Sequence, residues 1–275
     1  MTEQGVEFSG QSLVGVLTNA DEESDAGQPI VVFLNAGMVH RVGPNRLHVR
    51  LARELALCGF TSLRFDLSGI GDSPARTDGA SLRDAGLRDV RDALAFVANE
   101  RHGSTFVLVG LCSGADLAFK AALADKRVVG GVLIDGFPYH TFRSGMHRRA
   151  RQYAWHLRGR NWRKLVGADN PVLRRLRRSP KAVPSPGSFR QRDVPSREEA
   201  TAGLHALTER GVRLLVVGTP DRDYSYRRHF ADTFPTVRSD RVQVTFFPDA
   251  DHTFTLRANQ DRLIRTITEW ISCFQ

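Results

Sequence analysis

Short apolar segments rich in β-branched residues alternate along the chain with longer segments that carry apolar residues at helical spacing. The run 30–34, Ile-Val-Val-Phe-Leu, is apolar throughout, which is typical of a strand buried on both faces of a sheet. Leu47, Leu51 and Leu55 share one side of a predicted helix at 47–57. Similar patterns predict a strand or hairpin at 7–18, strands at 61–65, 105–109, 128–134, 212–217 and 242–247, and helices at 82–100, 115–124, 197–210, 226–234 and 260–274.

This alternation predicts an α/β fold with a mostly parallel, doubly wound sheet. The pattern stops between residues 137 and 196, where there is no convincing buried strand, and helical stretches at 148–157 and 171–178 precede a proline-rich segment. An insertion after one strand of such a sheet is expected to form a cap over the site at the strand ends. The predicted organisation is therefore a core of residues 1–136 and 197–275 with an Arg-rich helical cap of residues 137–196.

Positive charge is concentrated in this insertion. The whole chain carries a formal net charge of +9, and from Arg143 to Arg197 sixteen Lys and Arg residues stand against two Asp residues. Such a block can attract an anionic partner, although a solvated helical face is the simpler interpretation. Nothing in the sequence resembles a module that reads RNA or DNA, so we do not expect a nucleic-acid partner.

The cysteine content and the absence of targeting signals indicate which kinds of site and which cellular compartment to expect. Three cysteines, Cys58, Cys112 and Cys273, argue against a disulfide framework, and no metal-ligand spacing is present, so neither a metal nor a cofactor is expected. The first ten residues lack a secretory pattern, and no apolar run approaches the roughly 18–20 residues of a membrane span. We expect a cytoplasmic protein without a membrane span; the sequence does not predict its oligomeric state.

Residues 110–115, Gly-Leu-Cys-Ser-Gly-Ala, lie between a predicted strand and a predicted helix. The nucleophile elbow G-x-S-x-G has this context, and only very small residues fit two positions before and two positions after its nucleophile. Gly110 and Gly114 therefore make Cys112 the predicted nucleophile. Ser113 is the rival, but Leu111 would then stand where a small residue is required. A buried, inert Cys112 thiol is the remaining alternative.

An elbow nucleophile needs an acid and a histidine, which follow it in that order along the chain. His252 comes after the last predicted strand and before the last helix, where the catalytic histidine is expected. Asp221, just after the strand at 212–217, is the favoured acid, and Asp223 and Asp135 are the alternatives. The helix N-terminus and the neighbouring histidine are expected to lower the pKa of the nucleophilic thiol.

These residues resemble the α/β-hydrolase superfamily, and the likeness covers most of the chain. The stretch 65–73, Phe-Asp-Leu-Ser-Gly-Ile-Gly-Asp-Ser, is similar to the family's D-x-R-G-x-G-x-S motif, with Ser68 in place of the arginine. The cysteine elbow resembles that of dienelactone hydrolases. It also resembles exosortase-associated hydrolases found beside bacterial exopolysaccharide export systems, which share the N-x-G…R-V-G loop seen here at Asn35, Gly37 and Arg41-Val42-Gly43.

The resemblance implies an α/β-hydrolase fold and an oxyanion hole. The segment 35–38, Asn-Ala-Gly-Met, occupies the place of the family's His-Gly loop, without the histidine. One oxyanion donor would be the backbone N–H of Ser113, and the other the N–H of Gly37 or Met38. The aromatic residues near the insertion either line an acyl pocket or pack the core; the candidates for substrate binding are Tyr139, Phe142 and Trp155.

A cysteine nucleophile suits thioesters and activated esters, because the exchange of one thioester for another needs little assistance to the leaving group. The Arg-rich insertion would favour coenzyme A, a phosphopantetheine arm or an acidic carrier protein. We therefore predict a thioesterase-like hydrolase or acyl-transfer enzyme that acts through a Cys112 acyl-enzyme. A carboxylesterase or lactone hydrolase is the alternative, and a non-catalytic α/β-hydrolase-fold binding protein is the alternative of another class.

Overall fold

The structure is a computed structural model that describes residues 1–10, 13–20, 27–77, 79, 82–101, 105–137, 139, 141, 143–147, 194–220 and 224–274. The chain divides into two compact units. The first contains residues 1–139 and 193–275, and the second contains residues 140–192. The helices expected at 148–157 and 171–178 lie outside the described residues, and the cap function of the insertion stays a prediction.

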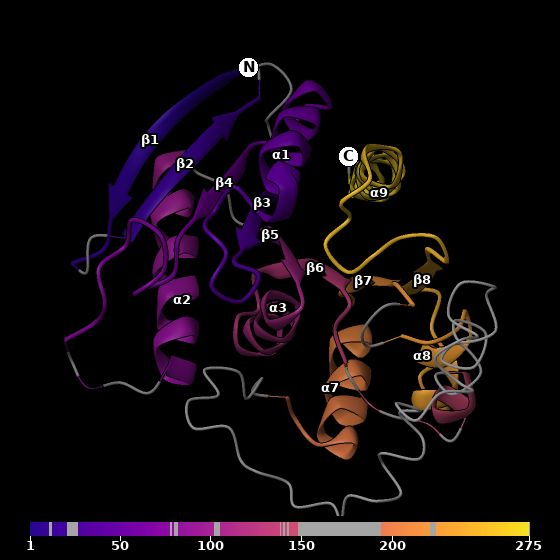
Figure 1. The fold of residues 1–275 in the computed structure, drawn as a ribbon. Coiled ribbons are helices and arrows are strands. Elements are labelled where there is room, and N and C mark those ends of the chain that lie inside the picture. Colours follow the sequence, from indigo (N-terminus) through magenta and orange to yellow (C-terminus); the bar gives the residue numbers. More distant parts are fainter. Residues whose placement is uncertain are drawn as a thin grey trace, which may run out of the picture. The chain divides into compact units, whose positions relative to one another are not determined.

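Eight strands of the described residues form one sheet in the order β1-β2-β4-β3-β5-β6-β7-β8 (Figure 1). From β3 onward along this order neighbouring strands are parallel, and β4 also pairs in parallel with β3, whereas β2 is antiparallel to both β1 and β4. The predicted doubly wound sheet is therefore confirmed. The strands are β1 (Thr2–Phe8), β2 (Leu13–Asn19), β3 (Ile30–Leu34), β4 (Ser62–Phe65), β5 (Phe106–Leu111), β6 (Val128–Ile134), β7 (Arg213–Gly218) and β8 (Val242–Phe246).

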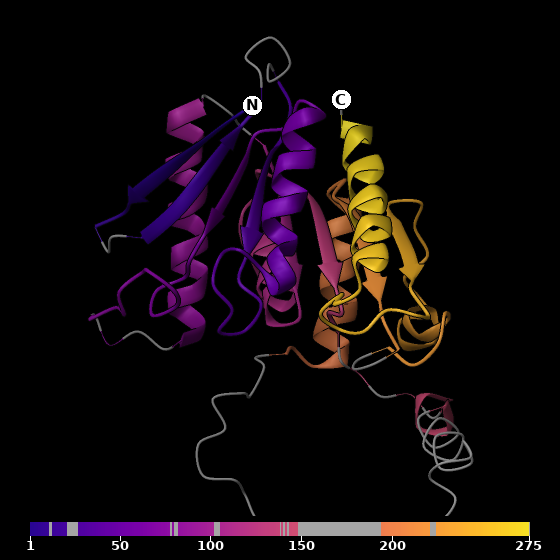
Figure 2. The same ribbon diagram turned by 45° about the horizontal axis from the view of Figure 1, so that its top comes forward.

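Helices cover both faces of this sheet (Figures 1 and 2). On one face lie α1 (Leu47–Leu57) and α9 (Arg257–Ile271), which contact each other. On the other face lie α2 (Leu82–Arg101), α3 (Ser113–Ala124) and α7 (Arg197–Glu209), with α3 between the other two. The short helix α8 (His229–Thr233) precedes β8, and 3₁₀ turns lie at Pro44–Arg46 and Ser272–Phe274. In the second unit, residues 143–147 are helical.

The sheet separates two apolar cores because successive side chains of a strand point to opposite faces. In β3, Val31 and Phe33 pack with α1 and α9, whereas Val32 and Leu34 pack with the helices of the opposite face. All five residues of β3 are buried, which explains why its sequence is apolar throughout rather than alternating. Because β3 to β8 pair in parallel, their carboxyl ends lie at the same end of the sheet.

The sequence-based boundaries hold to within a few residues, with two differences in kind. The segment expected as a strand or hairpin at 7–18 is a hairpin of β1 and β2 that begins at Thr2. The helix expected at 226–234 is only the five-residue α8, because residues 226–228 form a bend and a turn before it and the helix ends at Thr233. Among the described helices, none combines the length and the apolar composition that crossing a bilayer requires.

Candidate active site

Cys112 stands in a sharp turn between β5 and α3. Its backbone has φ 60° and ψ −119°, a left-handed conformation that side-chain-bearing residues rarely adopt. Its N–H donates to the Ile134 carbonyl at 2.8 Å, which continues the ladder between β5 and β6. Its carbonyl accepts hydrogen bonds from the backbone N–H groups of Ala115 and Asp116, which begin α3. The turn is therefore fixed by the strand on one side and the helix on the other.

The two framing glycines are required by close backbone contacts. A Cβ atom on Gly110 would lie 2.2 Å from the backbone carbonyl of Gly114. A Cβ atom on Gly114 would lie 2.6 Å from the backbone oxygen of Asn35, in the loop after β3. The predicted elbow centred on position 112 is therefore present, and the Cys112 thiol is half-buried rather than sealed in the core.

His252 lies in the loop between β8 and α9. The neighbouring Asp251 holds this loop, because its carboxylate accepts from the backbone N–H groups and the hydroxyls of Thr253 and Thr255. Phe254, fully buried with φ 51°, packs on Phe247. These contacts fix the position of the imidazole, and His252 forms a side-chain hydrogen bond with Cys112. The nucleophile and histidine predicted from the sequence are thus brought together.

Asp135 is the carboxylate that contacts the imidazole. Nδ1 of His252 donates to Oδ2 of Asp135 at 2.7 Å, which leaves Nε2 for Cys112. Asp135 follows β6 directly and is fully buried. The backbone N–H and the hydroxyl of Thr219, at the end of β7, also donate to Asp135, at 2.7 Å and 2.6 Å.

The favoured acid of the sequence analysis, Asp221, and its alternative Asp223 lie outside the described residues. Among the described residues, the carboxylate that contacts the imidazole is Asp135, one of the two alternatives. Thr219 and Asp251, which hold the acid and the histidine loop, were not foreseen. The end of β6, next to the elbow strand β5, was the available signal for Asp135.

The charges of the three groups favour a protonated imidazole. Burial lowers the pKa of His252, but hydrogen bonds with Asp135 and Cys112 and the negative charge of both outweigh it and raise the pKa to about 9. Burial raises the pKa of the Asp135 carboxyl, and the hydrogen bonds from His252 and Thr219 oppose this rise. The buried carboxylate therefore stabilises the imidazolium form of His252.

The loop after β3 reaches the first turn of α3. The backbone N–H of Gly37 donates to the Ser113 hydroxyl at 2.8 Å. Gly37 has φ +60° and is exposed, as is Met38, whose exposed fraction is 68%. The N–H expected to serve the oxyanion hole therefore points at Ser113, and the oxyanion roles of Ser113, Gly37 and Met38 stay predictions.

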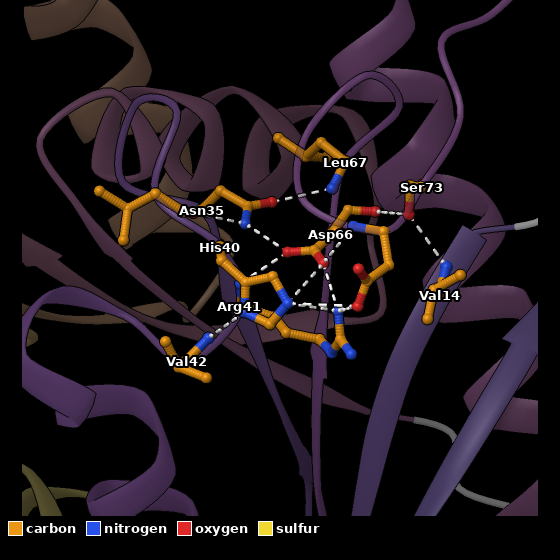
Figure 3. A network of polar contacts seen from close by, with 10 residues as sticks. Val14, Asn35, His40, Arg41, Val42, Asp66, Leu67 and Ser73 are labelled. Atoms are coloured by element: carbon orange, nitrogen blue, oxygen red, sulfur yellow. Dashed lines mark hydrogen bonds and ion pairs between the residues drawn. The ribbon is translucent and has the colours of Figure 1, made fainter.

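A buried carboxylate anchors this loop (Figure 3). Asp66, just after β4, is fully buried and accepts from the Asn35 amide, the Arg41 backbone N–H and the Asp72 backbone N–H. The Arg41 guanidinium also donates to it at 2.5 Å. The side-chain amide oxygen of Asn35 in turn accepts from the Leu67 backbone N–H. Asn35 therefore ties the loops after β3 and β4 together.

The same network contains a group that could hold a cation. His40, Asp66 and Asp72 have ligand atoms within 4.8 Å of one another. The Arg41 guanidinium lies between the two carboxylates, 2.5 Å from Asp66 and 2.7 Å from Asp72. Since this guanidinium already supplies a positive charge there, the cluster fits a structural ion-pair network better than a metal site.

Of the three aromatic residues that are candidates for substrate binding, the structure describes only Tyr139. Phe142 and Trp155 lie outside the described residues. Tyr139 packs its ring edge-on against Phe234, and its hydroxyl donates to the Pro195 carbonyl at 2.6 Å. Tyr139 therefore links the two ends of the core between which the insertion lies, and its part in substrate binding stays a prediction.

Comparisons with known proteins identify the family and the fold that this chain resembles. A model of the alpha/beta hydrolase family matches residues 31–266. An esterase of Pyrococcus furiosus is similar at 13% identity and TM-score 0.61, over 99% of this chain and 91% of that chain. A dienelactone hydrolase of Anabaena variabilis is similar at 14% identity and TM-score 0.60, over 98% and 96%. An alpha-beta serine hydrolase homologue of Coxiella burnetii is similar at 13% identity and TM-score 0.55, over 98% and 96%.

These likenesses confirm the predicted α/β-hydrolase fold, and at such identities the solved structures show the fold alone. A search of proteins with curated functions found no match.

The elbow contacts lead to a prediction about Gly110→Ala. Its new Cβ would meet backbone atoms at 2.2 Å, so the turn must shift, and we expect a loss of unfolding free energy of roughly 1–3 kcal/mol. Gly5→Ala is the matched control, because nothing lies within 4 Å of its added Cβ. Urea denaturation of both variants tests this, and equal stability of the two would contradict the tight turn.

The raised pKa of His252 leads to a second prediction. The folded protein binds this proton more tightly than the unfolded chain, whose histidine has a pKa near 6.5. Protonation therefore stabilises the fold fully below about pH 6.5, and this contribution is lost as the pH rises through about 9. The melting-temperature difference between wild type and His252→Gln should shrink from pH 6.5 to pH 9.5.

His205→Gln is the control for this measurement, since His205 is a half-buried histidine that contacts Thr236 rather than a carboxylate. A melting-temperature difference for His252→Gln that widens over the same pH range would contradict the imidazolium assignment.

Proposed function

Because this chain belongs to the alpha/beta hydrolase family, we propose that it cleaves an ester or thioester bond through an acyl-enzyme formed on Cys112. The observation that carries the proposal is the hydrogen-bonded chain from Cys112 through His252 to Asp135, at the end of the elbow strand. In this proposal Cys112 is the nucleophile, His252 the general acid and base, and Asp135 the acid that orients the histidine.

In the first step the Cys112 thiolate attacks the acyl carbonyl carbon. The new S–C bond forms as the carbonyl π electrons move onto oxygen, and donors at the start of α3 stabilise the oxyanion. The intermediate then collapses, and the bond to the leaving thiol or alcohol breaks. The leaving group takes the proton of the His252 imidazolium, which Asp135 had stabilised through Nδ1.

In the second step neutral His252 accepts a proton from water as the water oxygen attacks the acyl-enzyme carbonyl. The Cys112 thiolate departs, the acid product is released and the imidazolium is restored. A second alcohol or thiol in place of water would give acyl transfer by the same route. His252 thus begins and ends the proposed cycle in its protonated form, which its raised pKa favours.

Thioesters are the preferred substrates in this proposal. A thiolate leaving group resembles the attacking thiolate, so acylation by a thioester is close to thermoneutral. The basic segment from Arg143 to Arg197 would attract the phosphates of coenzyme A or the acidic surface of a carrier protein. Hydrolysis of a carboxylic ester or lactone is the second candidate, which the structural likeness to an esterase and a dienelactone hydrolase favours.

The proposed acyl-enzyme can be detected by intact-protein mass spectrometry. We expect incubation with acyl-coenzyme A thioesters or p-nitrophenyl esters of several chain lengths to add one acyl mass to the wild type. The adduct should be lost in Cys112→Ala and strongly reduced in His252→Ala, whereas Cys58→Ala, the matched cysteine control, should keep it. An adduct that survives Cys112→Ala would overturn the assignment of the nucleophile.

The identity of the acid is tested by a pair of variants. Asp135→Asn keeps the shape of the side chain but removes the charge that stabilises the imidazolium, so we expect kcat/KM to fall by roughly 10²–10⁴-fold. Asp221→Asn should leave kcat/KM within about threefold of wild type. The reverse order of effects in steady-state assays would restore Asp221 as the acid.

A further inference from the structure

The Gly37–Ser113 contact places a protein oxygen where the substrate oxyanion is expected. The Gly37 N–H is the donor that the family resemblance assigns to the oxyanion hole, and it already donates to the Ser113 hydroxyl at 2.8 Å. The Asp66 network holds the loop that carries this N–H through Asn35 and Arg41. The Ser113 hydroxyl is thus bound to a fixed donor, one residue from the nucleophile.

Ser113 has two hydrogen-bond donors next to Cys112, its backbone N–H and its hydroxyl. Its backbone N–H is the first of α3, where no intrahelical carbonyl accepts it. Within the part of the chain that the structure describes, its hydroxyl hydrogen has no acceptor either. A hydroxyl that accepts a hydrogen bond becomes a better donor through its own hydrogen. The bond from Gly37 therefore prepares the Ser113 hydroxyl to donate.

We propose that the Ser113 hydroxyl is an oxyanion donor in its own right. In this arrangement the oxyanion accepts from the N–H and the O–H of Ser113, and the Gly37 N–H polarises the hydroxyl instead of contacting the substrate. No covalent bond to Ser113 forms or breaks. The inference rests on the proposed acyl-enzyme at Cys112 and assigns Ser113, the rival nucleophile, a different part in the same step.

The competing arrangement makes the opposite prediction. If the oxyanion itself binds the Gly37 N–H, the Ser113 hydroxyl must first give up its 2.8 Å hydrogen bond and rotate away. The hydroxyl would then inhibit acylation, and its removal would speed the reaction. In the proposed arrangement the Ser113 hydroxyl keeps its hydrogen bond from Gly37, so removal of the hydroxyl should slow acylation. The sign of the change distinguishes the two arrangements.

The experiment compares wild type with Ser113→Ala and Ser113→Thr. Stopped-flow acylation by p-nitrophenyl acetate and by acetyl-coenzyme A gives the rate of the step that forms the oxyanion. Alkylation of Cys112 by iodoacetamide is the internal control, because displacement at a saturated carbon forms no oxyanion. Melting temperatures of the three proteins show whether the variants remain folded.

We expect Ser113→Ala to slow acylation by roughly 10²–10³-fold, as removal of an oxyanion donor does, with KM changed by less than about threefold. Ser113→Thr, which keeps a hydroxyl, should recover most of the rate, and alkylation should stay within about twofold of wild type in both variants. Acylation by Ser113→Ala that equals or exceeds the wild-type rate would overturn the inference, as would a matching loss of alkylation.

The same experiment distinguishes a failure of the proposed Cys112 acyl-enzyme from a failure of the Ser113 role. If the wild type undergoes alkylation at Cys112 but neither acyl donor acylates it, the proposed acyl-enzyme is wrong, and the role of Ser113 falls with it. If the wild type is acylated and Ser113→Ala is acylated equally fast, only the role of the hydroxyl is wrong.

Discussion

The left-handed backbone of Cys112 is the constraint on which the candidate active site depends. This conformation is held by the Ile134 carbonyl on the strand side and by the first turn of α3 on the helix side. Gly110 and Gly114 allow the backbones to approach to distances that a Cβ would prevent. The same bend that exposes the sulfur also turns the first N–H groups of α3 toward the place of the reaction. The proposed nucleophile and its proposed oxyanion donors therefore belong to one local structure.

The buried carboxylate of Asp135 is the second constraint. It accepts hydrogen bonds from the imidazole N–H and from the backbone N–H and hydroxyl of Thr219. These bonds stabilise its negative charge, which burial by itself disfavours. The effect reaches the sulfur through His252, whose protonated form is favoured at neutral pH. Asp66 similarly holds the loop after β3, where it binds Arg41 and Asn35. Two buried carboxylates thus hold the two loops that meet the elbow.

Local sequence patterns predict those features that depend on neighbouring residues. The buried strands, the glycine-framed turn at Cys112 and the position of His252 after the last strand are of this kind. The acid is different, because β6 and β7 are adjacent parallel strands whose carboxyl ends meet at the same edge of the sheet. Spacing along the chain therefore does not distinguish a carboxylate after one strand from a carboxylate after the other.

The contacts that tune the site depend on pairings between distant residues. Arg41 and Asp66 are 25 positions apart, and Gly37 and Ser113 are 76 positions apart. No periodicity or motif spacing predicts which of the many charged or hydroxyl side chains will meet in this way. The sequence thus predicts the elbow and the histidine, whereas the acid and the supporting hydrogen bonds require the folded chain.

The reactivity of the three cysteines tests the central claim most directly. Cys273 is exposed, and burial together with Glu54 raises the pKa of the Cys58 thiol, so these two residues provide internal references. The measurement is the rate of iodoacetamide alkylation of each cysteine at pH 6.5, followed by peptide mass spectrometry in wild type and His252→Ala. The account predicts that Cys112 reacts first in the wild type and loses this advantage in His252→Ala. Faster alkylation of Cys273 than of Cys112 in the wild type, with Cys112 unaffected by His252→Ala, would contradict it.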